Sequence, residues 1–147
     1  MRMRKGFTLI ELLIVLAIIA ALMAVVTPIA LNAVRKAKVT NVAENLRNIK
    51  AAVESYVYTD QISDFSSFDI ETVLNAGYLT NLDTSKYEVA VNTHTSTMVE
   101  FFAYYKDTDV TIDELDDILP QATDASHATD TSLGGNYPGL LFDVALW

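Results

Sequence analysis

The sequence predicts an α+β fold in which one long N-terminal α-helix packs on a small antiparallel β-sheet. Two features carry this prediction. An uncharged apolar run near the N-terminus passes directly into a stretch whose apolar residues recur every three or four positions, as on one face of a helix. Further along, two short segments rich in valine and aromatic residues flank a polar turn, which is typical of a β-hairpin.

Charge is distributed unevenly along the chain. The 147 residues carry a net charge of −9, yet eight of the ten basic residues lie in the first 50 positions. From residue 51 onward, two lysines stand against 17 acidic residues, and such a segment repels phosphate backbones. We therefore expect no nucleic-acid binding by the C-terminal part alone. Cysteine is absent, which excludes disulfides, thiolate metal sites and a cysteine nucleophile.

The apolar run contains one misplaced charge, Glu11. The 20 residues from Leu12 to Leu31 carry no charge, and a helix of that length crosses about 30 Å of hydrocarbon. A carboxylate at the edge of such a segment is costly in lipid and marks a functional residue by default. A cleaved secretory signal is the alternative, but its apolar core would be shorter and a polar region would follow Ala24.

The residues around Glu11 form a motif. The segment from Lys5 to Leu13 reads KGFTLIELL and follows a short basic leader. Glycine before an aromatic residue, with glutamate four residues after it, resembles the class III signal of type IV pilins and type II secretion pseudopilins. The resemblance implies cleavage between Gly6 and Phe7 by a prepilin peptidase, N-methylation of Phe7, and retention of the apolar helix in the mature subunit.

The resemblance also implies a partner for Glu11, namely the N-terminal amine of a neighbouring subunit during filament assembly by an inner-membrane machinery. Breaking a buried ion pair by removing one partner costs about 3–5 kcal/mol, so such a contact would hold subunits in register. The alternative is an ordinary single-pass anchor whose Glu11 reaches the membrane interface. Each side of the run has three basic residues, so charge does not set the orientation. We place the N-terminus in the cytoplasm on the resemblance.

The apolar helix is predicted to continue out of the membrane. Beyond Leu31 its apolar content narrows to a stripe with spacings of three and four, formed by Val39, Val42, Leu46, Ile49, Val53 and Tyr56. We expect one helix over residues 7–58, about 75 Å long, with a coiled coil as the alternative for its second half. Pro28 removes a backbone hydrogen bond and is predicted to kink or locally unwind the helix.

These features divide the chain into a cleaved cytoplasmic leader (1–6), a membrane and filament-core helix (7–31), an amphipathic continuation (32–58) and an acidic head (59–147). In the head, residues 69–79 predict a short helix that Asp69 caps and Gly77 ends. Residues 87–91 and 98–104 predict a hairpin, with residues 92–96 as its turn. A capping box, Thr111 with Glu114, opens a helix before Pro120. Residues 121–139 predict a long loop, and 140–147 a final strand.

The head has no convincing catalytic or metal motif. Its densest acidic cluster lacks the glycine and the closing glutamate of an EF-hand and predicts a solvated helix N-terminus; it consists of Asp107, Asp109, Asp113, Glu114, Asp116 and Asp117. Calcium binding in the 121–139 loop, through Asp124 and Asp130, stays an open alternative. His94 and His127 are expected to be surface loop residues. No phosphate-binding or nucleophile-elbow motif occurs, so we expect no enzyme, cofactor or metal.

The interpretation that the resemblance implies is a structural subunit of a type IV pilus-like filament. The subunit would lie in the membrane as a single-pass precursor, in contact with lipid, and then polymerise with copies of itself at the cell surface. A minor pilin or a type II secretion pseudopilin fits the same N-terminus. A membrane-tethered binding domain that never polymerises is the alternative of a different class.

Overall fold

A computed structural model of the chain describes residues 7–124 and 137–146. The chain divides into two compact units, residues 1–37 and 38–147. In the described part of the first unit, every residue from Leu9 to Ala37 is helical and exposed. The second unit is an α+β head, which confirms the predicted fold class.

The long helix, α1, runs from Leu9 to Asp60, close to the predicted range of 7–58. The helix continues without interruption through Pro28, so local unwinding there stays a prediction for other states of the chain. Directly before Pro28, the hydroxyl of Thr27 donates a 2.7 Å hydrogen bond to the carbonyl of Met23, about one turn earlier in the helix. Back-bonding of this kind is compatible with helix and often accompanies a bend.

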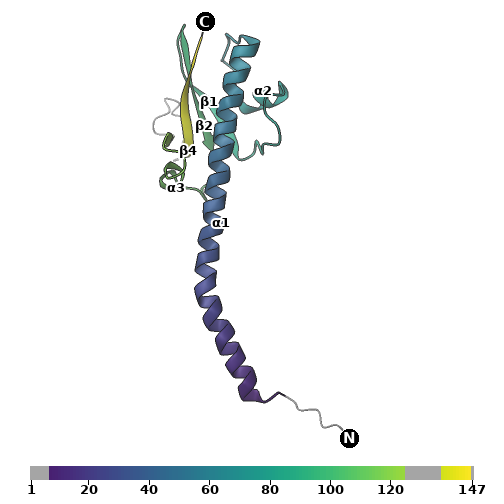
Figure 1. Ribbon diagram of the computed structural model, residues 1–147. Helices are drawn as coiled ribbons and strands as arrows, with labels where there is room; N and C mark the ends of the chain where they lie inside the picture. Colours follow the sequence, from purple (N-terminus) through teal and green to yellow (C-terminus); the bar gives the residue numbers. More distant parts are fainter. Residues whose placement is uncertain (1–6, 125–136, 147) are drawn as a thin grey trace. The chain divides into compact units, whose positions relative to one another are not determined.

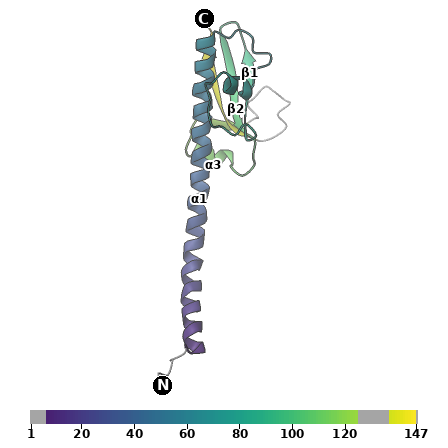
Figure 2. The same ribbon diagram turned by 90° about the vertical axis from the view of Figure 1, so that its right-hand side faces the viewer.

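Within the head, the predicted apolar stripe of α1 is the face that becomes buried. Val42, Leu46 and Val53 are each at most 2% exposed. The neighbouring residues Asn41, Glu44, Asn48 and Ser55 stay exposed or half-buried. The apolar stripe therefore determines which side of α1 faces the core, and the sheet lies beside this part of the helix (Figures 1 and 2).

The sheet has four antiparallel strands in the order β1-β2-β4-β3. Its strands are β1 (Tyr87–His94), β2 (Met98–Tyr105), β3 (Ala122–Asp124) and β4 (Pro138–Ala145). The predicted hairpin is confirmed as β1 and β2, which pair from Tyr87 with Tyr105 to His94 with Val99. β4 lies on the other side of β2 and reaches it after the connection that contains α3 and β3.

The two faces of the sheet bury different clusters. Alternate side chains, among them Val99, Phe101 and Phe142, join α1 in the main core. On the opposite face Phe102 and Tyr104 form a second cluster, with ring centroids 5.4 Å apart. Gly139 of β4 lies beneath this cluster: a Cβ there would be 2.5 Å from the carbonyl oxygen of Ala103 and 2.7 Å from Cζ of Phe102.

Both short helices of the head begin as the sequence predicts. α2 (Ile70–Asn75) is capped by Asp69, whose carboxylate accepts from the Thr72 backbone N–H. It ends in a Schellman motif: Gly77, with φ of +84°, donates to the carbonyl of Leu74, and Tyr78 donates to that of Val73. α3 (Ile112–Asp116) opens with the predicted capping box of Thr111 and Glu114.

Some predicted boundaries were wrong. Residues 92–94 belong to β1 rather than to its turn, because a register shift between Val91 and Thr93 accommodates the extra residue of a bulge. α3 ends at Asp116, four residues before Pro120. The predicted 121–139 loop contains β3 and the first two residues of β4. Residues 125–136, including His127 and Asp130, lie outside the described residues, as does Trp147.

The close packing of Gly139 against the carbonyl of Ala103 gives a first prediction. We expect Gly139→Ala to destabilise the head by about 1–3 kcal/mol, because the backbone carbonyl that the new methyl group meets cannot move aside alone. Gly77→Ala is the comparator, since a Cβ there has open space and costs only the left-handed conformation, about 1–2 kcal/mol. Urea unfolding of the full chain in detergent, followed by near-UV circular dichroism, measures both. An unchanged transition for Gly139→Ala would contradict the close packing.

Candidate assembly site

The N-terminal residues of the described chain form a capping box around Glu11. Thr8 precedes α1, and its backbone N–H and hydroxyl donate to Oε2 of Glu11 at 2.8 and 2.7 Å. In return, the backbone N–H of Glu11 points at the Thr8 hydroxyl oxygen at 3.4 Å. A carboxylate in the first turn also complements the helix macrodipole. Glu11 therefore has a local partner and a fixed orientation at the start of the helix.

The sequence contained this capping box as Thr8-Leu9-Ile10-Glu11, the same Thr-x-x-Glu signal that predicts α3. The prediction for Glu11 considered only a partner on another subunit and missed Thr8. Phe7 is 88% exposed beside this turn. Gly6 lies outside the described residues.

The apolar side chains that follow Glu11 are uncovered. Leu12, Leu22 and Val34, for example, are 56%, 61% and 68% exposed. Among the described residues, α1 is the one helix long and apolar enough to cross a membrane. A contiguous apolar surface of this size marks a site of contact with lipid or protein.

Comparison with known proteins identifies the same segment. Residues 1–27 match the prokaryotic N-terminal methylation motif. The chain is 48% identical over 52 residues to the fimbrial protein EcpB of Eikenella corrodens, a match that covers 35% of this chain and 33% of the relative. It is 38% identical over 76 residues to the type IV major α-pilin of Moraxella bovis, covering 50% of this chain and 48% of that protein.

The N-terminal part of the chain is similar to that of type IV pilins. The motif and the names of both relatives support the type IV pilin family, as the resemblance of residues 5–13 predicts. The chain spans about a third and about half of the length of these two relatives. No solved structure matches the chain.

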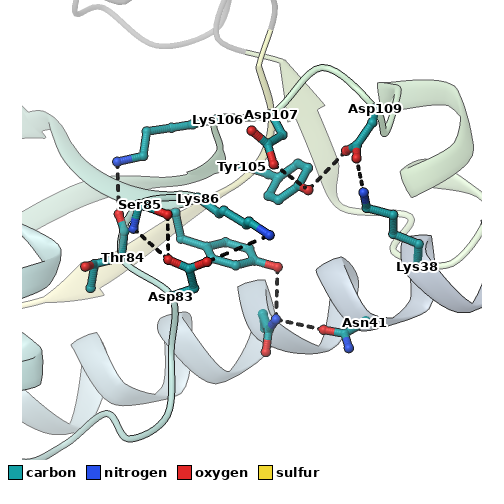
Figure 3. A network of polar contacts seen from close by, with 12 residues as sticks. Lys38, Asn41, Asp83, Thr84, Ser85, Lys86, Tyr105, Lys106, Asp107 and Asp109 are labelled. Carbon is teal, nitrogen blue, oxygen red and sulfur yellow. Dashed lines mark hydrogen bonds and ion pairs between the residues drawn. The ribbon is translucent and has the colours of Figure 1, made fainter.

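The head of this pilin-like chain contains a second group of polar residues, at the end of the sheet nearest α3 (Figure 3). The Tyr105 hydroxyl, in a residue only 1% exposed, lies 3.2 Å from Oδ2 of Asp107 and 3.0 Å from Oδ1 of Asp109. Lys38 of α1 forms an ion pair with Asp109. The amide of Asn45 donates to the Tyr87 hydroxyl at 2.9 Å. These contacts connect the sheet to α1.

The polar side chains of this network make contacts within the head. Within residues 7–124 and 137–146, no three His, Cys, Asp or Glu side chains are grouped so that they could hold a metal ion. The five aspartates of the predicted acidic cluster are exposed, and Asp113 and Glu114 lie in the first turn of α3, as expected of a solvated helix N-terminus. Asp107 and Asp109 also contact the Tyr105 hydroxyl, and Glu114 completes the α3 capping box. His94 ends β1 with its ring 5.1 Å from that of Phe65, and Asp124 lies in β3.

Tyr105 makes the head sensitive to alkali. Burial, with the Asp107 carboxylate as the next cause, raises the pKa of Tyr105 from 10.0 to about 12. The folded chain therefore keeps a phenol proton that the unfolded chain loses above pH 10, and stability must fall as pH rises from about 10 to 12. We expect the urea unfolding midpoint of Tyr105→Phe to decrease less between pH 10 and 12 than that of the wild type. Tyr58→Phe, which changes an exposed tyrosine of α1, is the control. Parallel pH profiles for wild type and Tyr105→Phe would contradict this assignment.

Proposed function

We propose that this chain is a structural subunit of a type IV pilus-like surface filament. It enters the membrane as a precursor, is cleaved after Gly6 by a prepilin peptidase, is N-methylated at Phe7, and polymerises with copies of itself through α1. The observation that carries the proposal is the methylation motif at the start of α1, where every described side chain up to Ala37 is exposed.

The exposed apolar helix supports both the membrane stage and the filament stage. Its 20 uncharged residues fit the thickness of a bilayer before assembly. Removal from lipid then requires a replacement apolar surface, and the matching surface of a second copy provides one. Ala17, Ala20, Ala21 and Ala24 recur at spacings of one, three and four, and small residues allow apolar helices to approach closely.

The geometry of Glu11 supports a role in subunit pairing. Both hydrogen bonds from Thr8 go to Oε2, and an ionised carboxylate has room for further donors. The capping box holds this carboxylate in the first turn, where a neighbouring N-terminal amine, created by cleavage before Phe7, would complete an ion pair in an apolar environment. Such a pair fixes the register between subunits because misaligned subunits leave a buried charge without its partner.

The acidic head fits the outside of such a filament. From residue 51 onward the chain has 17 acidic residues against two lysines, and the described acidic side chains are exposed or half-buried. Like charges keep the heads soluble and limit contact between them. The partners that this proposal implies are other copies of the subunit, the processing peptidase, the inner-membrane assembly machinery and, before assembly, lipid.

Glu11→Ala tests this function against a membrane-tethered domain that does not polymerise. We expect the variant to accumulate in the membrane with a folded head and to yield no surface filaments, because the pairing carboxylate is gone. Glu44→Ala, which removes an exposed carboxylate elsewhere on α1, is the matched control and should assemble normally. Electron microscopy of sheared surface material, with immunoblotting of membranes, measures both outcomes. Abundant filaments from Glu11→Ala would contradict the pairing role.

A further inference from the structure

A groove lies in the head between α1 and the segment that follows α2. Its volume is about 350 Å³, within the range of about 300–1,000 Å³ that is usual for ligand pockets. The described residues that line it are all uncharged, among them Asn48, Ser55, Tyr78 and Thr80. Within the described part of the chain, the side chains of Asn48, Ser55 and Thr80 make no hydrogen bond or ion pair. The groove therefore offers hydrogen-bond donors and acceptors without a charge.

The turn between β1 and β2, which we call the hairpin end (residues 93–98), is a second uncharged surface of the head. All six residues are exposed, and none of them is Asp, Glu, Lys or Arg. The Thr95 N–H donates to the carbonyl of Met98, and the Leu146 N–H donates to that of Thr97, both at 2.8 Å. These bonds fix the hairpin end at the end of the sheet opposite α3 (Figure 1). A turn of fixed shape loses little conformational entropy when it binds.

We propose that the hairpin end of one subunit docks in this groove on the head of a neighbouring copy. The inference rests on the proposed function, because it adds a contact between heads to the contacts made through α1. A contact between two different surfaces of identical subunits is heterologous, and it builds an open filament where its rotation does not close a ring. A protruding turn and a hollow on the same head are a pair of surfaces suited to such a contact.

The charge of the head favours a second copy as the occupant. From residue 51 onward, 17 acidic residues stand against two lysines, and like charges placed against each other suppress most contacts between two such heads. Other exposed turns, such as residues 107–109, carry carboxylates. The hairpin end and the groove bring no like charges together. The hydroxyl of Thr97 is matched in kind by the amide of Asn48 and the hydroxyl of Ser55, each of which donates and accepts.

The absence of cysteine allows a direct test in filaments. Ser55→Cys in the groove and Thr97→Cys in the hairpin end are combined in the full chain, and sheared filaments are treated with a short bis-maleimide. We expect a ladder of covalent multimers on denaturing gels, because each subunit is then joined to the next. Either cysteine alone should leave monomers. Ser55→Cys with Thr108→Cys, an exposed threonine of the acidic 107–109 turn, is the matched control and should give no ladder.

Charge substitutions provide a second measurement. Thr97→Glu should lower the yield of sheared filaments about tenfold, because it buries a carboxylate without a partner. Adding Ser55→Lys should restore the yield, whereas Thr108→Glu alone should leave it unchanged.

Filaments that form without a ladder, or a Thr97→Glu yield that Ser55→Lys does not restore, would overturn the inference and assign the groove to another ligand. Dimers from Ser55→Cys alone would also overturn it, since groove would then face groove. A wild-type chain that yields no filaments would be a failure of the proposed function itself.

Discussion

The structure depends on one constraint: the N-terminal part of α1 exposes apolar side chains on every side. Leu12, Leu22 and Val34 are each more than half exposed, and burying one such side chain is worth about 1.5–3 kcal/mol. Over the whole segment, this term is larger than the stability of an ordinary domain, about 5–15 kcal/mol. The segment is therefore stable in lipid or against other apolar helices, and its polar ends determine where it begins and stops.

The same helix serves two environments because its apolar pattern changes along its length. Up to Leu31 the pattern is continuous, as a hydrocarbon environment requires. From Val39 it is a stripe, and the stripe is buried beneath the sheet of the head. Polar contacts then reinforce this packing, since Lys38 pairs with Asp109 and Asn45 donates to Tyr87. Apolar burial carries most of the stability of the head, and these polar contacts fix the register between α1 and the sheet.

The parts of the fold predicted correctly are those with strong local signals. The length of α1 follows from its periodicity, and the starts of α2 and α3 follow from the caps Asp69 and Thr111. The order β1-β2-β4-β3, the bulge at Asn92 and the strand β3 depend on pairing between distant segments, which no local pattern encodes. The ion pair of Lys38 with Asp109, which are 71 residues apart, depends on tertiary packing in the same way. The contact of Thr8 with Glu11 is local and is encoded by the Thr-x-x-Glu pattern, but the prediction for Glu11 considered only the cost of its charge in lipid.

The most direct test of the central claim is intact-mass and N-terminal peptide analysis of the main protein band in filaments sheared from the cell surface. The account predicts that this band is the present chain and that it begins with N-methylated Phe7, since cleavage creates the amine that Glu11 is proposed to pair with. A band that begins at Met1, or at a residue after Ala24, would contradict the account, because the apolar helix would then carry its leader or be lost from the subunit.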